Sequence, residues 1–348
     1  MSKVVEHLAE LTGFRDRDVM DVTLVSALRE LLDPMAVGIF RLVGDPGQER
    51  WLTRARLHAD DAVATADPLW QEPERLPAAA QHPERIDCMR ERAVLKRCLG
   101  ESWLTLFPLA SEREAIGVLE LHTNAEPRAA QLRMIGSVLR IYNNFLGLLD
   151  YSERDTLTGL LNRKTFDESF LKAAGETGAP AAAPTIEQPT QERRHAGESA
   201  GYWLGVIDID HFKQVNDRFG HLIGDEVLLL LSRLMRSCFR FHDRLYRFGG
   251  EEFVALVRCP DETAAVQAFE RLRRTAAQYL FPQVGHISVS VGLTRVRSGD
   301  TPTTAFARAD RAVYHAKNAG RDQVRSYAAL VAAGLIVEHE QANAIELF

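Results

Sequence analysis

Acidic side chains follow an apolar run in the second half of the chain. Residues Trp203 to Ile207 predict a buried strand, and the chain continues with Asp208-Ile209-Asp210. A carboxylate at the end of a buried strand commonly meets a metal ion or a ligand. The next stretch is rich in groups that bind phosphate, metal ions or base edges, namely Phe212, Lys213, Asn216, Asp217, Gly220, His221, Gly224 and Asp225. Taken alone, Asp225 is better explained as the cap of a helix over residues 226–240.

A second acidic group lies further along, where Gly249-Gly250-Glu251-Glu252 joins predicted strands at 245–248 and 253–257. Two glycines favour a tight hairpin because they tolerate positive φ. Adjacent glutamates are costly to hold together unless water or a divalent cation neutralises them. If the hairpin lies beside the strand that ends in Asp208, then Asp208 and Glu251 converge on Mg²⁺, which takes one or two carboxylates plus substrate phosphates. Alone, such a motif is usually an exposed turn.

The first part of the chain predicts a small α/β module with an antiparallel sheet. Residues 1–32 are expected to be helical and to end before Pro34. Strand pairs are expected at 36–43 with 50–57 and at 103–109 with 115–121, the second pair joined by a charged turn at 111–114. Residues 58–85 are expected to form a loop, and residues 86–98 a short helix.

A long helix is expected over residues 127–154, between the two parts. Its apolar residues repeat at steps of three and four, which is the spacing of a coiled-coil seam and predicts a dimer contact. The alternative is one amphipathic helix packed on its own domain. The residues of this seam are Leu132, Ile135, Leu139, Tyr142, Leu146 and Leu149.

Composition bounds the class of protein. The chain has 348 residues, 46% hydrophobic and 26% charged, which predicts two folded domains and excludes disorder of the whole chain. The formal net charge of −6 argues against a general nucleic-acid binder.

Residues 173–200 are rich in Ala and Pro and are expected to form a flexible insertion, whereas residues 329–348 form a tail with an apolar start. The N-terminus lacks the apolar core of a signal peptide and no run could span a membrane, so we expect a cytoplasmic protein.

Cysteine and histidine carry little information about function. No Cys-x-x-Cys pair occurs, which argues against a disulfide framework or a structural zinc site and favours buried, small apolar residues. These cysteines are Cys88, Cys98, Cys238 and Cys259. Three histidines of the first part are isolated in sequence and are expected to be surface or structural residues: His58, His82 and His122.

Five blocks in fixed order resemble the GGDEF family, the diguanylate cyclases, over roughly residues 150–328. The blocks span residues 155–163, 208–225, 247–253, 288–292 and 309–321. Glutamate replaces the aspartate of the family's name, so that the motif reads Gly-Gly-Glu-Glu-Phe, but both are carboxylates. The resemblance implies a cyclase domain at 155–328 with an α/β (α+β), palm-like fold around a central antiparallel sheet, similar to nucleotide cyclases.

The resemblance also implies a reaction, in which two GTP molecules give cyclic di-GMP and two pyrophosphates on a homodimer with Mg²⁺ or Mn²⁺. Asp208, the Ile209 carbonyl and Glu251 would hold the metal ions, and Asn216 and Asp225 would read guanine. Phosphates would meet Lys213, Lys317, Arg321 and the backbone amides near His211 and Phe212. Glu251, Glu252 and Lys213 are the expected catalytic residues.

Two regulatory features are also implied. Arg240 and Asp243 match an Arg-x-x-Asp site that binds the product and inhibits many members of the family, with Arg271 as a third contact. Arginine suits both phosphate and guanine. The first part, residues 1–126, is similar to GAF domains, with a PAS-like module as the alternative, and would receive an unknown small-molecule or protein signal.

Two other functions stay open. The domain could have lost turnover and only bind GTP or cyclic di-GMP, or it could make an adenine-containing dinucleotide. Both are disfavoured because the expected metal-binding and base-reading residues are all present, namely Asp208, Asn216, Asp225, Glu251 and Lys317.

Overall fold

The structure is a computed structural model that describes residues 2–13, 16–44, 47–67, 73–110, 115–178 and 200–338. The chain divides into two compact units, Met1–Ser152 and Glu153–Phe348. Within the described ranges, no helix is both long and apolar enough to cross a membrane. The expected turn at 111–114, most of the expected insertion and the end of the tail lie outside the described residues.

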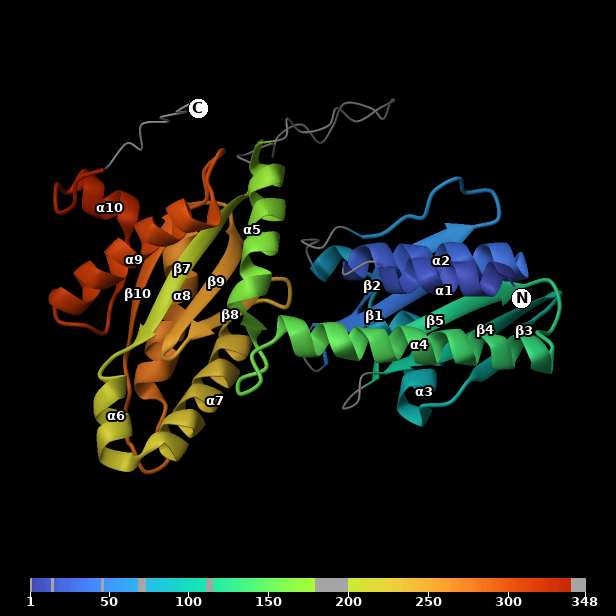
Figure 1. Cartoon of the computed structure of the whole chain (residues 1–348), viewed down its shortest axis with the longest axis horizontal. Coiled ribbons are helices and arrows are strands. Elements are labelled where there is room, and N and C mark those ends of the chain that lie inside the picture. The colour runs from blue at the N-terminus through green and yellow to red at the C-terminus, as the bar shows by residue number, and fades with distance from the viewer. Residues whose placement is uncertain are drawn as a thin grey trace. The chain divides into compact units, whose positions relative to one another are not determined.

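The first unit is built on a five-stranded antiparallel sheet in the order β2-β1-β5-β4-β3 (Figure 1). The strands are β1 (Ala36–Val43), β2 (Arg50–His58), β3 (Leu95–Leu99), β4 (Ser102–Ala110) and β5 (Ala115–Thr123). One face packs on helices α1 (Ser2–Gly13), α2 (Arg17–Leu32) and α4 (Ala129–Glu153). The other face packs on α3 (Pro83–Glu91), and two 3-10 turns, η1 (Pro73–Arg75) and η2 (Ala79–Gln81), precede that helix.

Most of the expected elements of this unit are present, with three corrections. The expected N-terminal helix is two helices, and it ends before Pro34 as predicted. Residues 95–99 form strand β3 rather than the end of a helix, because they pair with β4 along the sheet edge. Cys98 is exposed rather than buried, whereas the other three cysteines are buried, and all four are free thiols.

The apolar seam of α4 lies inside the first unit. Ile135, Leu139, Tyr142, Leu146 and Leu149 are all buried in the core that α1, α2 and the sheet complete. The prediction that this seam forms a dimer contact is therefore wrong, because the heptad spacing serves packing on the unit's own sheet. The outward face of the same helix carries a different set of exposed apolar side chains, Ile141, Leu148 and Tyr151.

The second unit contains a six-stranded sheet in the order β11-β10-β7-β9-β8-β6. The four central strands pair antiparallel, as expected, and only the two edge strands pair parallel with their neighbours. These strands are β6 (Leu161–Asn162), β7 (Gly201–Ile209), β8 (Arg244–Gly249), β9 (Glu252–Cys259), β10 (Val289–Arg295) and β11 (Val324–Ser326).

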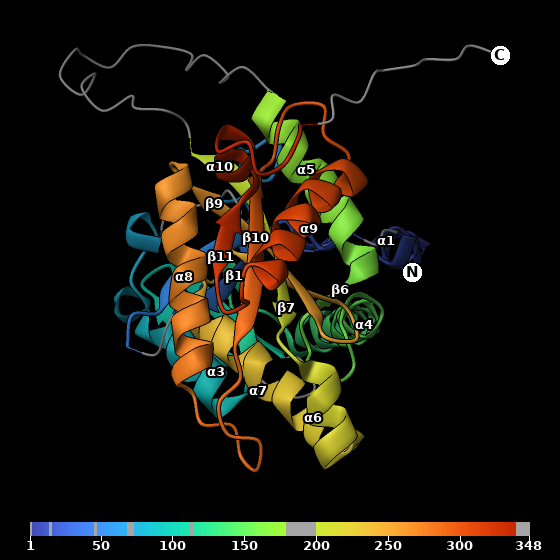
Figure 2. The same cartoon turned by 90° about the vertical axis from the view of Figure 1, so that its left-hand side faces the viewer.

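Helices cover both faces of this sheet, with α8 on one side of β10 and α9 on the other (Figure 2). The first face packs on α6 (Phe212–Phe219), α7 (His221–Cys238) and α8 (Glu262–Gln278). The second carries α5 (Arg163–Gly178) and α9 (Pro302–Asn318). A Cβ at Gly292 would lie 2.1 Å from the Ala309 carbonyl oxygen, so glycine lets α9 approach β10 closely.

The boundaries of the expected insertion and tail differ from the prediction. Residues 173–178 belong to helix α5, so the expected insertion begins later than predicted. The tail begins with α10 (Tyr327–Ala332), which docks on α9 through Tyr327 and Leu330 against Ala312. The apolar start of the tail therefore has a packing role.

A buried carboxylate ties the helices and strands of the first unit together. Asp21 of α2 is fully buried and accepts a hydrogen bond from Arg54 Nε at 2.9 Å and another from the Tyr142 hydroxyl. Arg41 of β1 lies 3.8 Å away. Burial, followed by the Asp21 charge, raises the pKa of Tyr142, so the phenol stays a donor. Asp21 therefore joins α2, β1, β2 and α4.

We predict that Asp21→Ala lowers the free energy of unfolding of this unit by about 3–5 kcal/mol, because two arginines lose their buried counter-charge. Asp18→Ala is the matched control, since Asp18 pairs with the same Arg54 but is 44% exposed, and it should cost at most about 1 kcal/mol. Urea unfolding of the full chain, followed by tryptophan fluorescence with Trp203 of the second unit replaced by phenylalanine in every variant, measures both. Equal effects of the two substitutions would contradict the role given to Asp21.

Candidate active site

The carboxyl end of β7 brings the expected acidic residues together. Asp208 is paired with Glu252 of β9 on one side and with Ser290 of β10 on the other. Its side chain is 8% exposed, and its Oδ2 accepts from Lys317 Nζ of α9 at 2.7 Å. Its Oδ1 is buried and has no hydrogen-bond partner among the described residues. One oxygen of Asp208 is therefore open to a ligand.

The Gly-Gly turn places the glutamates beside Asp208. Gly249 has φ of +147° and Gly250 of +51°, values that favour glycine. Arg247 holds the turn, because its guanidinium donates to the Gly250 carbonyl at 2.9 Å and to Asp155 at 3.1 Å. The turn then enters β9 at Glu252, opposite Asp208, with Glu251 one residue earlier.

The carboxylates of this site repel one another. Burial raises the pKa of Glu251 and of Glu252, and the charge of Asp208 raises both further. Burial also raises the pKa of Asp208, although the Lys317 ammonium opposes that shift. Asp310 of α9 adds another negative charge that acts on Asp208 and Glu252. The cluster therefore carries more negative charge than Lys317 neutralises.

A divalent cation fits this donor set. The open Oδ1 of Asp208 and the neighbouring Glu251 offer carboxylate oxygens, and Ile209 ends β7 directly after Asp208. Among the described residues, no three or more His, Cys, Asp or Glu side chains form a ready-made metal cage. A divalent cation that also takes water and substrate phosphates needs only one or two protein carboxylates.

Asp210 anchors the end of β7, a role that the sequence pattern alone does not indicate. It is 5% exposed and accepts from the Ser288 and Ser290 hydroxyls at 2.6 and 2.7 Å. It also accepts from the backbone N–H of Asp322 at 3.0 Å. The carboxylate thus fixes the loop after α9 to the strand that carries Asp208. The one feature of the sequence that could have indicated this role is the position of Asp210 in the Asp208-Ile209-Asp210 triplet, directly after the buried strand.

The turn from β7 into α6 presents groups suited to phosphate. His211 stands before the helix with φ of +58°, and the first N–H groups of any helix lack partners within the helix. Phe212 is buried and anchors α6 to the core, whereas Lys213 is exposed. At the end of α9, Arg321 is exposed, with φ of +63°, and follows Lys317 by four residues.

Asn216 of α6 and Asp225 of α7 lie on adjoining helices. A Cβ at Gly224 would come within 2.0 Å of Asn216 Oδ1, so this glycine makes room for the amide beside α7. The expectation that Asp225 caps its helix is wrong, because α7 begins at His221. The side chain of Asp225 is exposed on that helix. Its carboxylate has no partner among the described residues and is free to accept a ligand's N–H groups.

The Arg-x-x-Asp segment forms a closed turn after α7. Asp243 accepts from the Arg240 backbone N–H at 2.8 Å, and the Asp243 N–H donates to the Arg240 carbonyl at 3.0 Å. Burial raises the pKa of Asp243 to about 6 against the opposing charges of Arg240 and Arg271. Arg271 of α8 is held on the Cys238 carbonyl by Nε at 2.9 Å. All three expected residues therefore meet, and the Arg240 guanidinium stays exposed.

Comparisons with known proteins give the family of the second unit. Residues 152–323 match the diguanylate cyclase, GGDEF domain. The chain is 42% identical over 153 residues to diguanylate cyclase DgcP of Pseudomonas aeruginosa, covering 42% of this chain and 23% of that protein. It is 37% identical over 174 residues to diguanylate cyclase DgcM of Escherichia coli, covering 50% and 38%.

Among solved structures, the active GGEEF domain of a diguanylate cyclase from Vibrio cholerae aligns with 30% identity and a TM-score of 0.40, covering 48% of this chain and 97% of that one. The chain spans less than half the length of the two curated relatives. The residues that match the GGDEF domain, 152–323, lie in the second unit apart from Ser152. Residues 152–323 therefore belong to the GGDEF family of diguanylate cyclase domains.

Proposed function

We propose that the chain is a diguanylate cyclase, which condenses two GTP molecules into cyclic di-GMP and releases two pyrophosphates. The observation that carries this proposal is the convergence of Asp208 and Glu251 at one sheet edge, with one buried carboxylate oxygen left open. Phosphoryl transfer needs charge neutralisation and in-line geometry more than it needs a covalent intermediate. The site offers both acidic ligands and free cations for such a reaction.

The acidic residues would hold Mg²⁺ or Mn²⁺. Asp208, the Ile209 carbonyl and Glu251 are the proposed ligands, and Glu252 lies opposite Asp208 as a further acidic contact. When bound, a divalent cation would neutralise the attacking and leaving oxygens of the transfer. Glu251 is also the proposed acceptor of the proton of the 3′-hydroxyl group. Asp210 and Arg247 position these carboxylates from behind.

The guanine and the phosphates would lie on the α6–α7 side of the site. Guanine presents its N1–H and N2–H₂ groups to an acceptor, which the free carboxylate of Asp225 supplies, with the Asn216 amide beside it. Adenine lacks this donor pair, so GTP is favoured over ATP. The exposed Lys213 and Arg321, together with Lys317 and the amides near His211 and Phe212, would bind the phosphates.

The product has two-fold symmetry, and each domain holds one GTP, so the enzyme would act as a homodimer. The buried seam of α4 cannot supply the dimer contact while the first unit stays folded. The outward stripe of Ile141, Leu148 and Tyr151 can, since these side chains are spaced seven and three residues apart, as in a coiled coil. Leu148 and Tyr151 are 65% and 77% exposed.

Two regulatory roles complete the proposal. Cyclic di-GMP would bind at Arg240, Asp243 and Arg271, because an exposed guanidinium beside a buried carboxylate suits both the phosphates and the guanine of the product. The first unit would act as a GAF-like sensor, a proposal supported by its antiparallel sheet and by the long helix that leaves it. A PAS-like module remains the alternative.

Incubation of the full chain with Mg²⁺ and GTP, ATP or both, followed by chromatography, tests the proposed function. We predict cyclic di-GMP from GTP alone and no product from ATP alone. Tight binding of GTP without product would identify a binding module instead. An adenine-containing dinucleotide would show that Asp225 does not select guanine.

We predict that Glu251→Gln lowers the rate of cyclic di-GMP formation at least about 100-fold, because a charged contact of the transition state is lost. Circular dichroism should show an unchanged fold. Glu168→Gln is the matched control, since Glu168 is exposed on α5 away from this cluster, and it should leave the rate unchanged. Full activity of Glu251→Gln would mean that the metal site is elsewhere.

We predict that Arg240→Ala relieves inhibition by added cyclic di-GMP while the initial rate without product stays close to that of the unmodified protein. Arg233→Ala, on an exposed position of α7, is the control and should stay inhibited. Dose–response curves of cyclase activity against product measure the difference. Inhibition of equal strength in both variants would refute the assignment of the Arg-x-x-Asp turn.

A further inference from the structure

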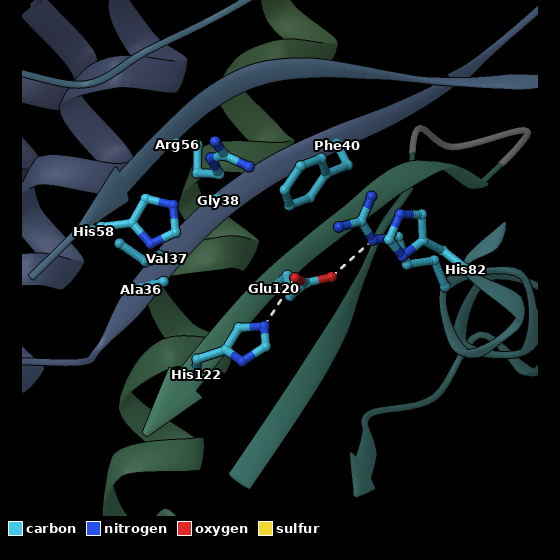
Figure 3. Close-up of a pocket in the computed structure, with 10 residues that line it drawn as sticks. Ala36, Val37, Gly38, Phe40, Arg56, His58, His82, Glu120 and His122 are labelled. Carbon is cyan, nitrogen blue, oxygen red and sulfur yellow. Dashed lines mark hydrogen bonds and ion pairs between the residues drawn. The ribbon is translucent and has the colours of Figure 1, made fainter. Parts of the chain in front are cut away.

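A hollow lies over strands β2, β1 and β5 of the first unit's sheet, near the start of β1 and on the face that carries α3 (Figure 3). β1 runs between β2 and β5, so that each residue from Ala36 to Arg41 is flanked by one residue of each neighbouring strand. Ala36 stands between His58 and His122, and Gly38 between Arg56 and Glu120. Adjacent strands lie about 4.8 Å apart, so the flanking side chains on β2 and β5 are separated by about 10 Å where they leave the sheet. The floor between them is the methyl group of Ala36 and the Phe40 ring, which lies over Gly38, 2.9 Å from where a Cβ of that residue would stand.

Helix α3 closes one side of the hollow. His82 and the buried Arg85 contribute to its wall, and the Arg85 guanidinium lies 3.6 Å above the centre of the Phe40 ring. The cavity has a volume of about 240 Å³, room for about eight water molecules at roughly 30 Å³ each. This volume is below the range of about 300–1,000 Å³ typical of sites for drug-sized ligands. It fits a small metabolite rather than a nucleotide.

The charges around the cavity leave one cation without a partner. Arg85 Nε donates to Glu120 at 2.7 Å, and the His122 ring lies 3.0 Å from the same carboxylate. Although burial opposes the shift, hydrogen bonds from His122 and Arg85 lower the pKa of Glu120 to about 2, so this acid is charged and already paired. The Arg56 guanidinium makes no hydrogen bond or ion pair with any described residue. The charges of Arg85 and Glu120 cancel, so among the arginines and the glutamate that line the cavity Arg56 is one positive charge in excess.

We propose that this cavity binds a small organic carboxylate. The carboxylate group would lie on Arg56, whose planar fork matches two carboxylate oxygens. The body of the ligand would cover Ala36 and pack against the Phe40 ring, which already lies over Gly38, and the His58 ring would donate from the rim. An apolar floor with a few convergent polar groups is the common composition of a small-molecule site.

Two other occupants fit less well. A metal ion is disfavoured, since the three histidines with Glu120 are not arranged as a metal site within the described residues. Inorganic phosphate would pair with Arg56 but would leave the apolar floor uncovered. The binding itself does not depend on the proposed cyclase activity, and only its use as a regulatory signal does.

Isothermal titration of the full chain with benzoate, acetate and the neutral benzamide tests this inference. We expect benzoate to bind more tightly than acetate, because its ring covers the floor, and benzamide not to bind, because it lacks the charge. Failure of both carboxylates to bind at about 10 mM would overturn the proposal. Equal affinity for benzoate and benzamide, or tighter binding of inorganic phosphate than of benzoate, would also overturn it.

Substitutions test the charge of Arg56 and the space above Ala36 separately. Arg56→Gln should weaken benzoate binding at least about tenfold through loss of a charge-assisted hydrogen bond, whereas Arg97→Gln, at an exposed position of β3 outside the cavity, should not. Ala36→Leu should abolish binding by filling the floor while every charge remains. Thermal unfolding checks that each variant is folded. Unchanged benzoate affinity in Arg56→Gln would show that the cavity does not use this cation.

Discussion

Mutual repulsion among carboxylates at the end of β7 is the constraint on which the second unit depends. Asp208, Glu251 and Glu252 are brought together by strand register and by a glycine turn, and Lys317 is the cation that pairs directly with Asp208. Burial raises the pKa of each of the three acids, which means that the fold holds them at a cost. Such an arrangement is favourable when a cation and a phosphate-bearing substrate share the site. The supporting contacts of Asp210 and Arg247 keep the arrangement in place without a ligand.

The first unit uses a buried carboxylate in the opposite way. Asp21 is fully buried, but arginines and a tyrosine surround it, so its charge is satisfied within the fold. The same contrast applies within this unit to Glu120, which is paired, and Arg56, which has no partner among the described residues. Satisfied charges hold the structure together, whereas unsatisfied charges mark the places where a ligand can bind. Helix α4 links the two units along the chain, because it carries Tyr142 in the first core and ends at Glu153.

Much of this organisation could be predicted from the sequence, since antiparallel strands around Asp208 and a Gly-Gly hairpin both have local signals. The exposure of Asp225 could not be predicted from the sequence, because it depends on α7 starting at His221, five residues before the predicted helix. Strand β3 was missed since Leu95–Leu99 is stabilised by pairing with β4 rather than by its own pattern. The seam of α4 has the same spacing whether it packs inside a unit or between two copies. His58, His82 and His122 are far apart in sequence, and only strand register and the position of α3 gather them around one cavity.

The most direct test of the central claim is a crystal structure of the full chain with Mg²⁺ and a non-hydrolysable GTP analogue. The account predicts a cation bound between the open oxygen of Asp208 and the carboxylate of Glu251, with the analogue's phosphates completing its coordination. The guanine should lie against Asn216 and Asp225. The account would be contradicted if Asp208 and Glu251 were too far apart to share an ion. It would also be contradicted if the nucleotide were bound away from the α6–α7 pair.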